Sequence, residues 1–285
     1  DHTHKRIYAT AGRLVLLLAL VAGLLVARGA QGVQAGPAPI QTFFLSMPED
    51  QVRTAFGVID VSGGTFSNSM VSITSIAVTV SNTIIYYDQW EGGYEADIAN
   101  PVQTSTLIFG DGNTANGDAC IYAATLCSGD VLTAGAVLVL RNNVPSNPRG
   151  TATSFDAHDK VATTQLVAVT RAMWDSGVGT VLAGALQVYD TNGYGTDFRL
   201  PAGENLASAS SAMFEYAGLF IMAANAGTTV NIDSDGNGTT DYTTTLNAGQ
   251  TYMLSSSTTG VTLNSNARIT STLPIQVNLI TGDIN

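Results

Sequence analysis

The chain consists mainly of short runs of β-branched and aromatic residues, separated by turns rich in Gly, Asn, Asp, Ser and Pro. The clearest runs are 71–80, 83–87, 131–140, 161–169 and 181–189. Such side chains favour the pleated, half-buried surface of a strand. Only 48–56 and 204–216 have helical character, and the Pro-Glu-Asp start of the first suits a helix N-terminus. The pattern predicts an all-β fold with one or two short helices.

Three blocks of the first half recur in the same order in the second half. The matching blocks are 81–88 with 226–233, 132–140 with 246–254, and 160–169 with 268–277. The offsets fall from 145 to 114 to 108, so the first copy carries extra residues, at about 99–128. Shared β composition alone is the alternative explanation. The ordered blocks predict two similar β-sandwich units, jelly-roll or immunoglobulin-like, at 36–175 and 176–285.

The N-terminal segment has the three parts of a secretory signal peptide. Basic residues precede an unbroken apolar run, 14–27, and a small-residue stretch follows at 32–35. This run is shorter than the roughly 20 residues that a membrane-spanning helix needs. Cleavage after Ala35 is therefore favoured over an uncleaved anchor. We expect 1–35 to be removed, and the mature chain to be extracellular or on the cell surface without membrane insertion.

The charge balance excludes some classes of partner. The formal net charge is −11, and removal of 1–35, with four basic residues and one acid, changes it to −14. Binding to a phosphate backbone needs clustered Lys and Arg, so nucleic acid is not expected as a partner. Anionic membrane surfaces are disfavoured for the same reason. An acidic surface suits solubility and the capture of cations.

The chain has two cysteines, Cys120 and Cys127, and both lie in the extra residues of the first half. In an exported chain, a close pair in a Gly-, Asn- and Asp-rich loop predicts a disulfide. Two free buried thiols are the alternative. Two cysteines alone are too few for a Cys-only metal site.

Four short motifs follow one another in the second half. They are aromatic-Gly-Thr-acid-Phe at 194–198, Gly-Thr-Thr-Val at 227–230, Gly-Gln-x-Tyr at 249–252 and Ile-Thr-Ser-x-x-Pro-Ile at 269–275. In this order they resemble the N-terminal domain of IgGFc-binding proteins, which also occurs in large bacterial surface proteins. The stretch 84–97 is similar to one near the start of long bacterial surface proteins with repeated β domains. The resemblance implies a structural or adhesive surface protein without catalytic residues.

The best candidate site is an acidic loop in the second half. Oxygen-bearing side chains stand at positions 1, 3, 5 and 9 of this loop, with Gly at position 6; they are Asp233, Asp235, Asn237 and Asp241. This spacing lets one loop wrap Ca²⁺, which takes about six to eight oxygen ligands. Position 12 is Thr244 instead of Glu, and the flanking segments are strands, so the loop is not an EF-hand. The pattern predicts a Ca²⁺ loop on a β-hairpin, with a bare hairpin turn as the alternative.

A second candidate site combines acids and aromatic rings around a Gly-Gly pair. Its residues are Asp88, Trp90, Glu91, Tyr94 and Glu95. One interpretation is a sugar-binding platform, and another is a carboxylate pair for glycoside hydrolysis. A hairpin with the two rings as cross-strand partners is the alternative.

A third cluster, Asp156, His158 and Asp159, lacks the further ligands of a zinc site and the Gly-x-Ser-x-Gly elbow of a hydrolase. We interpret it as a surface turn.

Three functions follow from these patterns, in order of preference. The first is a non-enzymatic structural or adhesive surface module whose partners are other surface or matrix proteins or glycans. The second is a lectin-like carbohydrate-binding module, which predicts that Trp90 and Tyr94 are exposed side by side. The third is a secreted glycoside hydrolase, which predicts two carboxylates facing each other across a cleft.

Overall fold

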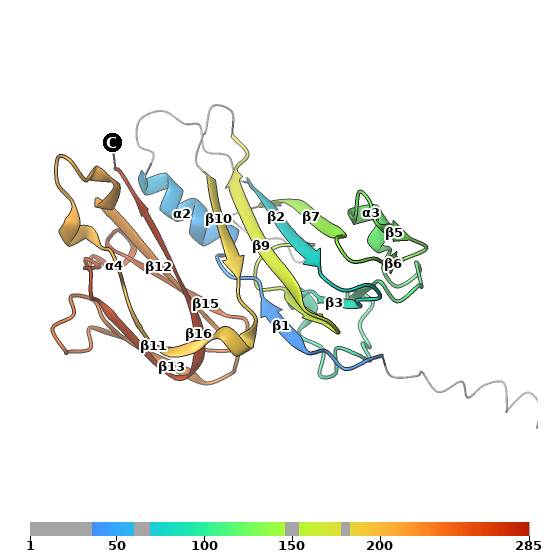
Figure 1. Cartoon of the computed structure of the whole chain (residues 1–285). Coiled ribbons are helices and arrows are strands. Elements are labelled where there is room, and N and C mark those ends of the chain that lie inside the picture. Colours follow the sequence, from blue (N-terminus) through green and yellow to red (C-terminus); the bar gives the residue numbers. More distant parts are fainter. Residues whose placement is uncertain (1–35, 60–68, 146–153, 178–182, 285) are drawn as a thin grey trace, which may run out of the picture. The chain divides into compact units, whose positions relative to one another are not determined.

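The computed structural model describes residues 36–59, 69–145, 154–177 and 183–284. They form several antiparallel sheets with a few short helices, which confirms the predicted all-β fold (Figure 1). The chain from Pro37 onward forms one compact unit. The predicted signal peptide, 1–35, lies outside the described residues. Within the described ranges, no helix is long and apolar enough to cross a membrane.

The first half is a sandwich of two four-stranded sheets. Sheet A has the strand order β1-β8-β3-β4, and sheet B has the order β10-β9-β2-β7. The strands are β1 Gln41–Phe44, β2 Ser69–Val78, β3 Ile85–Asp88, β4 Leu107–Phe109, β7 Val137–Pro145, β8 Lys160–Thr163, β9 Val167–Asp175 and β10 Ala183–Val188. Side chains from both sheets, including Tyr87 of sheet A and Ile76 of sheet B, share one buried cluster. The short elements between them are η1 Trp90–Gly92, α3 Ala119–Tyr122, β5 Cys127–Ser128 and β6 Val131–Leu132.

The second half is a single six-stranded sheet. Its order is β14-β13-β16-β12-β15, and β11 also pairs with β16. The strands are β11 Gly195–Arg199, β12 Tyr216–Ala223, β13 Thr228–Asp233, β14 Tyr242–Leu246, β15 Thr251–Ser255 and β16 Arg268–Gly282. The first part of β16 pairs with β13 and the second part with β12. Side chains on the inner face of this sheet, such as Ile221 of β12 and Ile269 of β16, form one core. The short helices are η2 Thr191–Gly193, η3 Glu204–Leu206, η4 Ala212–Phe214 and α4 Ser256–Thr259.

The two halves share one pattern of strand pairing. In sheet A, Asp88 at the end of β3 lies opposite Lys160 of β8. In the six-stranded sheet, Asp233 at the end of β13 lies opposite Arg268 of β16. The offsets, 145 for the acids and 108 for the bases, are those of the sequence blocks. The Asp88 and Asp233 turns therefore occupy equivalent places in the pairing pattern.

The long strands follow the same correspondence. Ile76 of β2 lies opposite Val169 of β9, and Ile221 of β12 lies opposite Val277 of β16. β7 and β15 take the equivalent places on the other side of β2 and β12. One difference is that β8 and β9 are separate strands, whereas their counterpart β16 is continuous.

The strand pairing bears on the predicted boundary between the two units. β10 pairs with β9 through six residue pairs, from Ala183 opposite Trp174 to Val188 opposite Val169. The boundary predicted between residues 175 and 176 falls inside this hairpin. The first strand of the six-stranded sheet, β11, begins at Gly195. The change from one half to the other therefore lies after Val188, because sheet membership depends on the partner strand and not on the local pattern.

The helix α2, Glu49–Ile59, packs between the two halves (Figure 1). It follows Pro48 and has two acids in its first turn, as the sequence predicts. The apolar residues of α2 pack against residues of sheet B and also against residues of β12. This cluster contains Met47, Val52, Ala55, Phe56, Met70, Met173, Tyr216 and Phe220. One helix thus closes an end of the first sandwich and covers the six-stranded sheet.

The predicted disulfide is confirmed. Cys120 of α3 is bonded to Cys127 of β5, and their Cα atoms are 5.2 Å apart. This separation lies in the range that a disulfide spans without backbone movement. The bond closes a small loop in the extra residues of the first half.

Candidate metal-binding sites

Two groups of carboxylates lie close enough together to share a cation. Each group offers three oxygens that lie within 4.8 Å of one another; the groups are Asp233, Asp235 and Asp241, and Glu91, Asp156 and Asp159. The first group was predicted from the loop spacing. The second brings together residues that the sequence analysis placed in two separate clusters.

The Asp233 loop joins β13 to β14, so it lies on the predicted β-hairpin. Asp233 Oδ1 accepts hydrogen bonds from the amides of Gly236 at 2.8 Å and Asn237 at 3.1 Å. Its Oδ2 accepts one from the amide of Gly238 at 2.8 Å. Gly236 and Gly238 have φ of 75° and 93°, a region that glycine adopts without strain. The two glycines therefore let the loop turn back on the carboxylate at its start.

These amides set the charge state of Asp233. Burial alone would raise the pKa of this carboxyl, but the hydrogen bonds from Gly238, Gly236 and Asn237 hold the pKa below its usual value. Asp233 is therefore ionised at neutral pH, which is the form that ligates a cation.

The other carboxylates of the loop are exposed and keep free acceptor positions. Asp241 Oδ2 accepts hydrogen bonds from the amide and the hydroxyl of Ser234, both at 2.7 Å. Asp235 accepts hydrogen bonds from the backbone and side-chain nitrogens of Asn237. A carboxylate has about four acceptor positions, so each group can still ligate a metal. Asn237 lies beside them, with its Oδ1 accepting from the amide of Thr239 at 2.7 Å.

An open pocket of about 110 Å³ lies beside the Asp233 loop. Its wall contains two guanidinium side chains, together with Asn231, Asp233, Gly236, Gly238, Thr240 and Thr270. One guanidinium, Arg268, makes a two-point ion pair with exposed Asp197, with contacts of 3.0 and 2.7 Å. The other, Arg199, donates to the carbonyl of Asn266 at 3.0 Å. The pocket thus places positive charge and hydroxyl groups next to the acidic loop.

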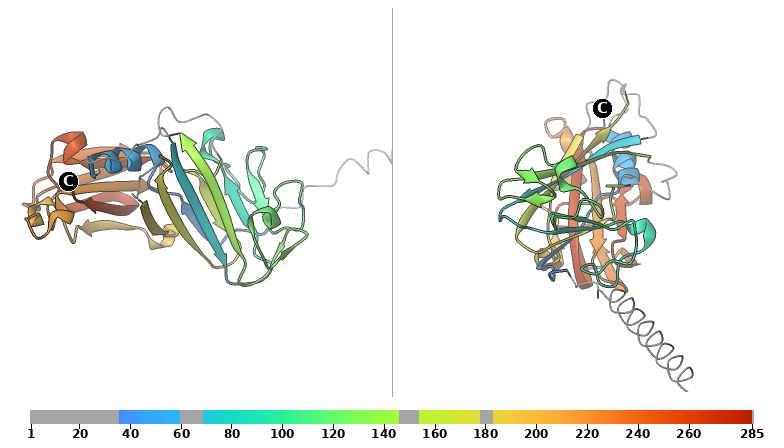
Figure 2. Two further views of the ribbon diagram at one scale, coloured as in Figure 1. Left: turned by 90° about the horizontal axis from the view of Figure 1, so that it is seen from above. Right: turned by 90° about the vertical axis from the view of Figure 1, so that its right-hand side faces the viewer.

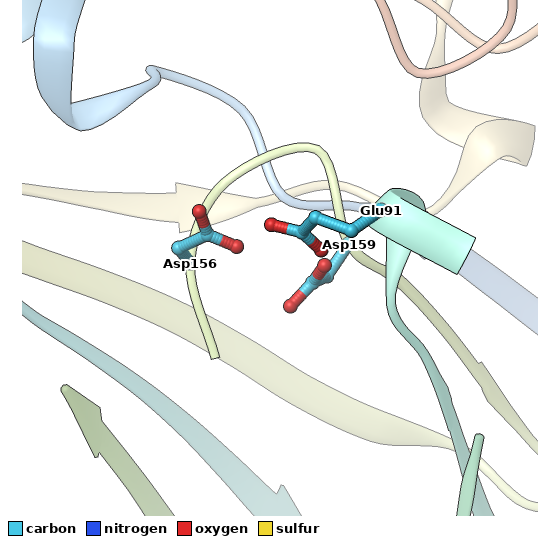
Figure 3. A group of neighbouring side chains, drawn as sticks. All are labelled: Glu91, Asp156 and Asp159. Carbon is cyan, nitrogen blue, oxygen red and sulfur yellow. The ribbon is translucent and has the colours of Figure 1, made fainter. Parts of the chain in front are cut away.

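The second group lies in the first half (Figure 3). Glu91 comes from η1, and Asp156 and Asp159 come from the loop before β8. Both aspartates are fully buried. The surface-turn interpretation of this cluster was therefore wrong. The loop is held inside because the amide of His158 donates to the carbonyl of Leu45 at 2.8 Å.

Asp159 has defined hydrogen bonds in this buried group. Its Oδ2 accepts from the hydroxyl of Tyr87 at 2.5 Å, and its Oδ1 from the amide of Trp90 at 3.1 Å. Burial raises the pKa of Asp159 well above its usual value, and the nearby charge of Asp156 adds to this. Two like charges about 5 Å apart repel by roughly 3 kcal/mol at an effective dielectric constant of about 20. The group is therefore stable when it holds a proton or a cation.

The sequence offered no direct signal for this group. Glu91 stands 65 residues before Asp156, and only the packing of η1 on the loop before β8 brings them together. Two of the three carboxylates are fully buried. A glycoside hydrolase needs its two carboxyl groups open to substrate, which this arrangement does not offer.

The acids among the predicted ligand-binding residues stabilise the fold locally. Asp88 is fully buried, pairs with Lys160 at 2.9 Å and accepts from the amide of Glu95 at 2.9 Å. Glu95 is also buried and accepts from the amides of Val102 and Gln103 at 2.9 and 2.7 Å. These carboxylates order the long loop between β3 and β4.

The two rings of this cluster do not form a shared flat surface. The Tyr94 hydroxyl donates to the carbonyl of His158 at 2.5 Å, and its ring lies edge-on to Phe44 with centroids 5.4 Å apart. Trp90 is 37% exposed and lies edge-on to the His158 ring. The rings belong to η1 and the loop after it, so they are not cross-strand partners either.

No protein-family model matches the chain, and neither a curated protein nor a solved structure matches it. The resemblance to the N-terminal domain of IgGFc-binding proteins therefore stays a prediction. The class that the fold itself defines is an antiparallel all-β protein with a few short helices and one disulfide.

Proposed function

We propose that the chain is an extracellular structural or adhesive β module that binds Ca²⁺ in its Asp233 loop. The observation that carries this proposal is the loop itself, in which backbone amides orient Asp233 and three carboxylate oxygens lie within 4.8 Å. Oxygen ligands are those that Ca²⁺ prefers, and extracellular modules bind it at about 10⁻⁴ to 10⁻³ M.

The extracellular placement rests on the disulfide and the signal-like N-terminus. A disulfide persists in oxidising compartments and is rare in the cytosol. The Cys120–Cys127 bond closes a loop of the first half, and residues 1–35 have the pattern of a signal peptide. Ca²⁺ is abundant outside cells, so a weak site on an exposed hairpin would be filled there.

A structural role follows from where the loop lies. The hairpin of β13 and β14 forms an edge of the six-stranded sheet, and Asp235 and Asp241 at its tip are exposed. A bound cation would cancel their mutual repulsion and fix the hairpin. A fixed, exposed edge next to an open pocket suits contact with other surface or matrix proteins or with glycans.

Calorimetric titration of the purified protein with CaCl₂ tests the cation site. We expect binding in the parent protein and at least tenfold weaker binding in Asp233→Asn/Asp235→Asn. The matched control is Asp111→Asn, at an exposed position of an Asp-Gly turn in the first half. Absence of binding in the parent would refute the Ca²⁺ proposal. Loss of binding in Glu91→Gln, with full binding in the Asp233 loop variant, would move the cation to the buried group.

The pocket beside the loop favours glycan binding as the second candidate function. Two guanidinium groups and two threonine hydroxyls in one wall match the carboxylate and hydroxyl groups of an acidic sugar. Retention of the protein on immobilised acidic glycans, with and without a Ca²⁺ chelator, tests this. We expect Arg199→Ala to reduce retention and Arg141→Ala, outside the pocket, to leave it unchanged. Equal retention of both variants would remove the pocket from this role.

A further inference from the structure

The face of the six-stranded sheet that points away from its core is covered by the first half. All eight residues of β12 are buried, so both faces of this strand are shielded. Leu219 and Ile221 point into the core of the second half. Tyr216 and Phe220 point the other way and join the cluster formed by α2. The apolar side of a helix from one half thus covers the outer face of the sheet in the other half.

The shared register identifies the equivalent face in the first half. The offset of 145 between β2 and β12 maps Phe220 onto Ser75 and Gly218 onto Ile73. The inner residues correspond as well, because Ile76 and Ile221 both lie in the cores of their halves. The outer face of sheet B is therefore the counterpart of the face that α2 covers. In the left view of Figure 2, β2 (teal) lies between its neighbours in this sheet.

This face is mostly apolar, with half-buried residues on its central strand β2 and exposed residues on β7 and β9. Cross-strand rows on it are Val139-Ser75-Thr170, Val137-Ala77-Ala168 and Arg141-Ile73-Ala172. Val139 is 42% exposed. Arg141 is the one charged side chain of these rows, and its guanidinium lies 5.7 Å from the centre of the Trp174 ring. A contiguous apolar surface with exposed side chains is typical of an interaction site.

The second half has a segment in the place that α2 takes in the first. Phe43 of β1 lies opposite Val161, and Phe198 of β11 lies opposite Ile269, so β1 and β11 correspond with an offset of 155. The same offset takes the start of α2 to Glu204, the start of η3. We call residues 204–215 the docking segment. Two of its apolar side chains are exposed, Leu206 to 41% and Met213 to 60%, as we expect for a surface whose partner is absent.

Each half thus has one covering segment and one apolar outer face, and among the residues that the structure describes only one such pair is joined. We propose that a second copy of this chain joins the other pair, with its docking segment on the outer face of sheet B. The contact would repeat the packing of α2 on β12, and Glu215 of the docking segment offers charge complementary to Arg141. Because the two surfaces differ, the contact is head-to-tail and extends into linear assemblies.

Sedimentation velocity of the purified protein over a range of concentrations tests this proposal. We expect the parent protein to form larger species as its concentration rises. Val139→Asp on the face and Met213→Asp on the docking segment should each weaken association at least about tenfold, the loss typical of an interface anchor. Ile121→Asp, at an exposed position of α3 outside both surfaces, is the matched control and should associate like the parent.

Mixing the two defective variants gives the sharpest test. The Val139→Asp protein keeps its docking segment, and the Met213→Asp protein keeps its face, so an equimolar mixture should form dimers and nothing larger. Thr170→Arg, at an exposed polar position of the same face, replaces Val139→Asp if that variant is less stable than the parent. A parent protein that stays monomeric, a Met213→Asp variant that assembles normally, or a mixture that stays monomeric would each overturn the proposal.

Discussion

Glu49 and Glu204 occupy equivalent places in the two halves, but their surroundings differ. Glu49 is fully buried and forms an ion pair with fully buried Arg171. Glu204 is half-buried and accepts hydrogen bonds from the Ser256 hydroxyl at 2.8 Å and the Ala217 amide at 3.3 Å. The counterpart of Arg171 in the second half is Leu279, which packs against the core.

The buried carboxylates show the same divergence. Asp156 and Asp159 correspond to Asn264 and Ala267, so the second half lacks a buried acidic group at this place. Its close carboxylates lie instead in the exposed hairpin loop that starts at Asp233. The comparison teaches that backbone pairing is kept between the halves while polar chemistry changes freely. A change in backbone pairing would disturb every strand of a sheet, so the pairing is kept. A change of one polar side chain affects only the few groups that contact it.

The largest expected effect concerns the buried ion pair of the first half. Arg171→Leu introduces the residue of the second half and removes the buried positive charge that faces the Glu49 carboxylate. We expect a loss of about 3–5 kcal/mol in the free energy of unfolding. The double variant Arg171→Leu/Glu49→Leu should recover much of this. Urea denaturation measures both, and a loss below about 1 kcal/mol in the single variant would contradict the role of the pair.

The next effect concerns the Asp233 loop, whose counterpart in the first half, the Asp88 turn, has its Asp88 and Glu95 carboxylates buried and hydrogen-bonded within the fold. Ca²⁺ at a hundredfold excess over its dissociation constant should stabilise the native protein by about 2.7 kcal/mol. Thermal melts with CaCl₂ or with a chelator measure this shift. The shift should disappear in Asp233→Ala/Asp235→Ala. An unchanged midpoint in the parent protein would contradict Ca²⁺ binding.

The disulfide belongs to the extra residues of the first half alone. Cys120→Ser/Cys127→Ser should lower stability by about 2 kcal/mol, since the bond closes a short loop. A melt of the parent protein under reducing conditions should give the same shift. Reduction that also lowers the stability of the double-serine variant would show that the reductant acts elsewhere.

The smallest effect is a difference in pH dependence between the two acidic groups. The folded-state pKa of Asp159 is raised, so its contribution to stability is present below the unfolded pKa of about 3.9 and is lost as pH rises through the folded value. The folded-state pKa of Asp233 is lowered, so its contribution is present above about 3.9 and is lost as pH falls through the folded value.

The stability of Asp159→Asn relative to the parent should therefore increase with pH. The stability of Asp233→Asn relative to the parent should instead decrease as pH rises towards about 4 and then stay level at higher pH. Urea denaturation across pH 3 to 8 measures both trends. The same trend in both variants would show that the two carboxyls do not differ in the way their surroundings indicate.

Local patterns in the sequence were sufficient to predict the elements and their repetition. The alternating and β-branched runs predicted the strands, and the ordered blocks had the offsets that the strand pairs Asp88–Lys160 and Asp233–Arg268 show. The hairpin at Asp233 and the disulfide Cys120–Cys127 were also predictable. These features depend on residues near one another in the chain, where turn chemistry and side-chain alternation act directly.

Contacts between distant residues decided the rest. β10 resembles any other strand in sequence, and only pairing with β9 places it in sheet B. Asp156 and Asp159 have polar side chains typical of a surface turn, yet packing beside Leu45 and Tyr87 buries them. The sequence likewise could not indicate that α2 covers the outer face of β12 while the equivalent face of sheet B keeps exposed residues on β7 and β9. Burial is set by what packs against a residue from elsewhere in the chain, and periodicity along one strand does not contain that information.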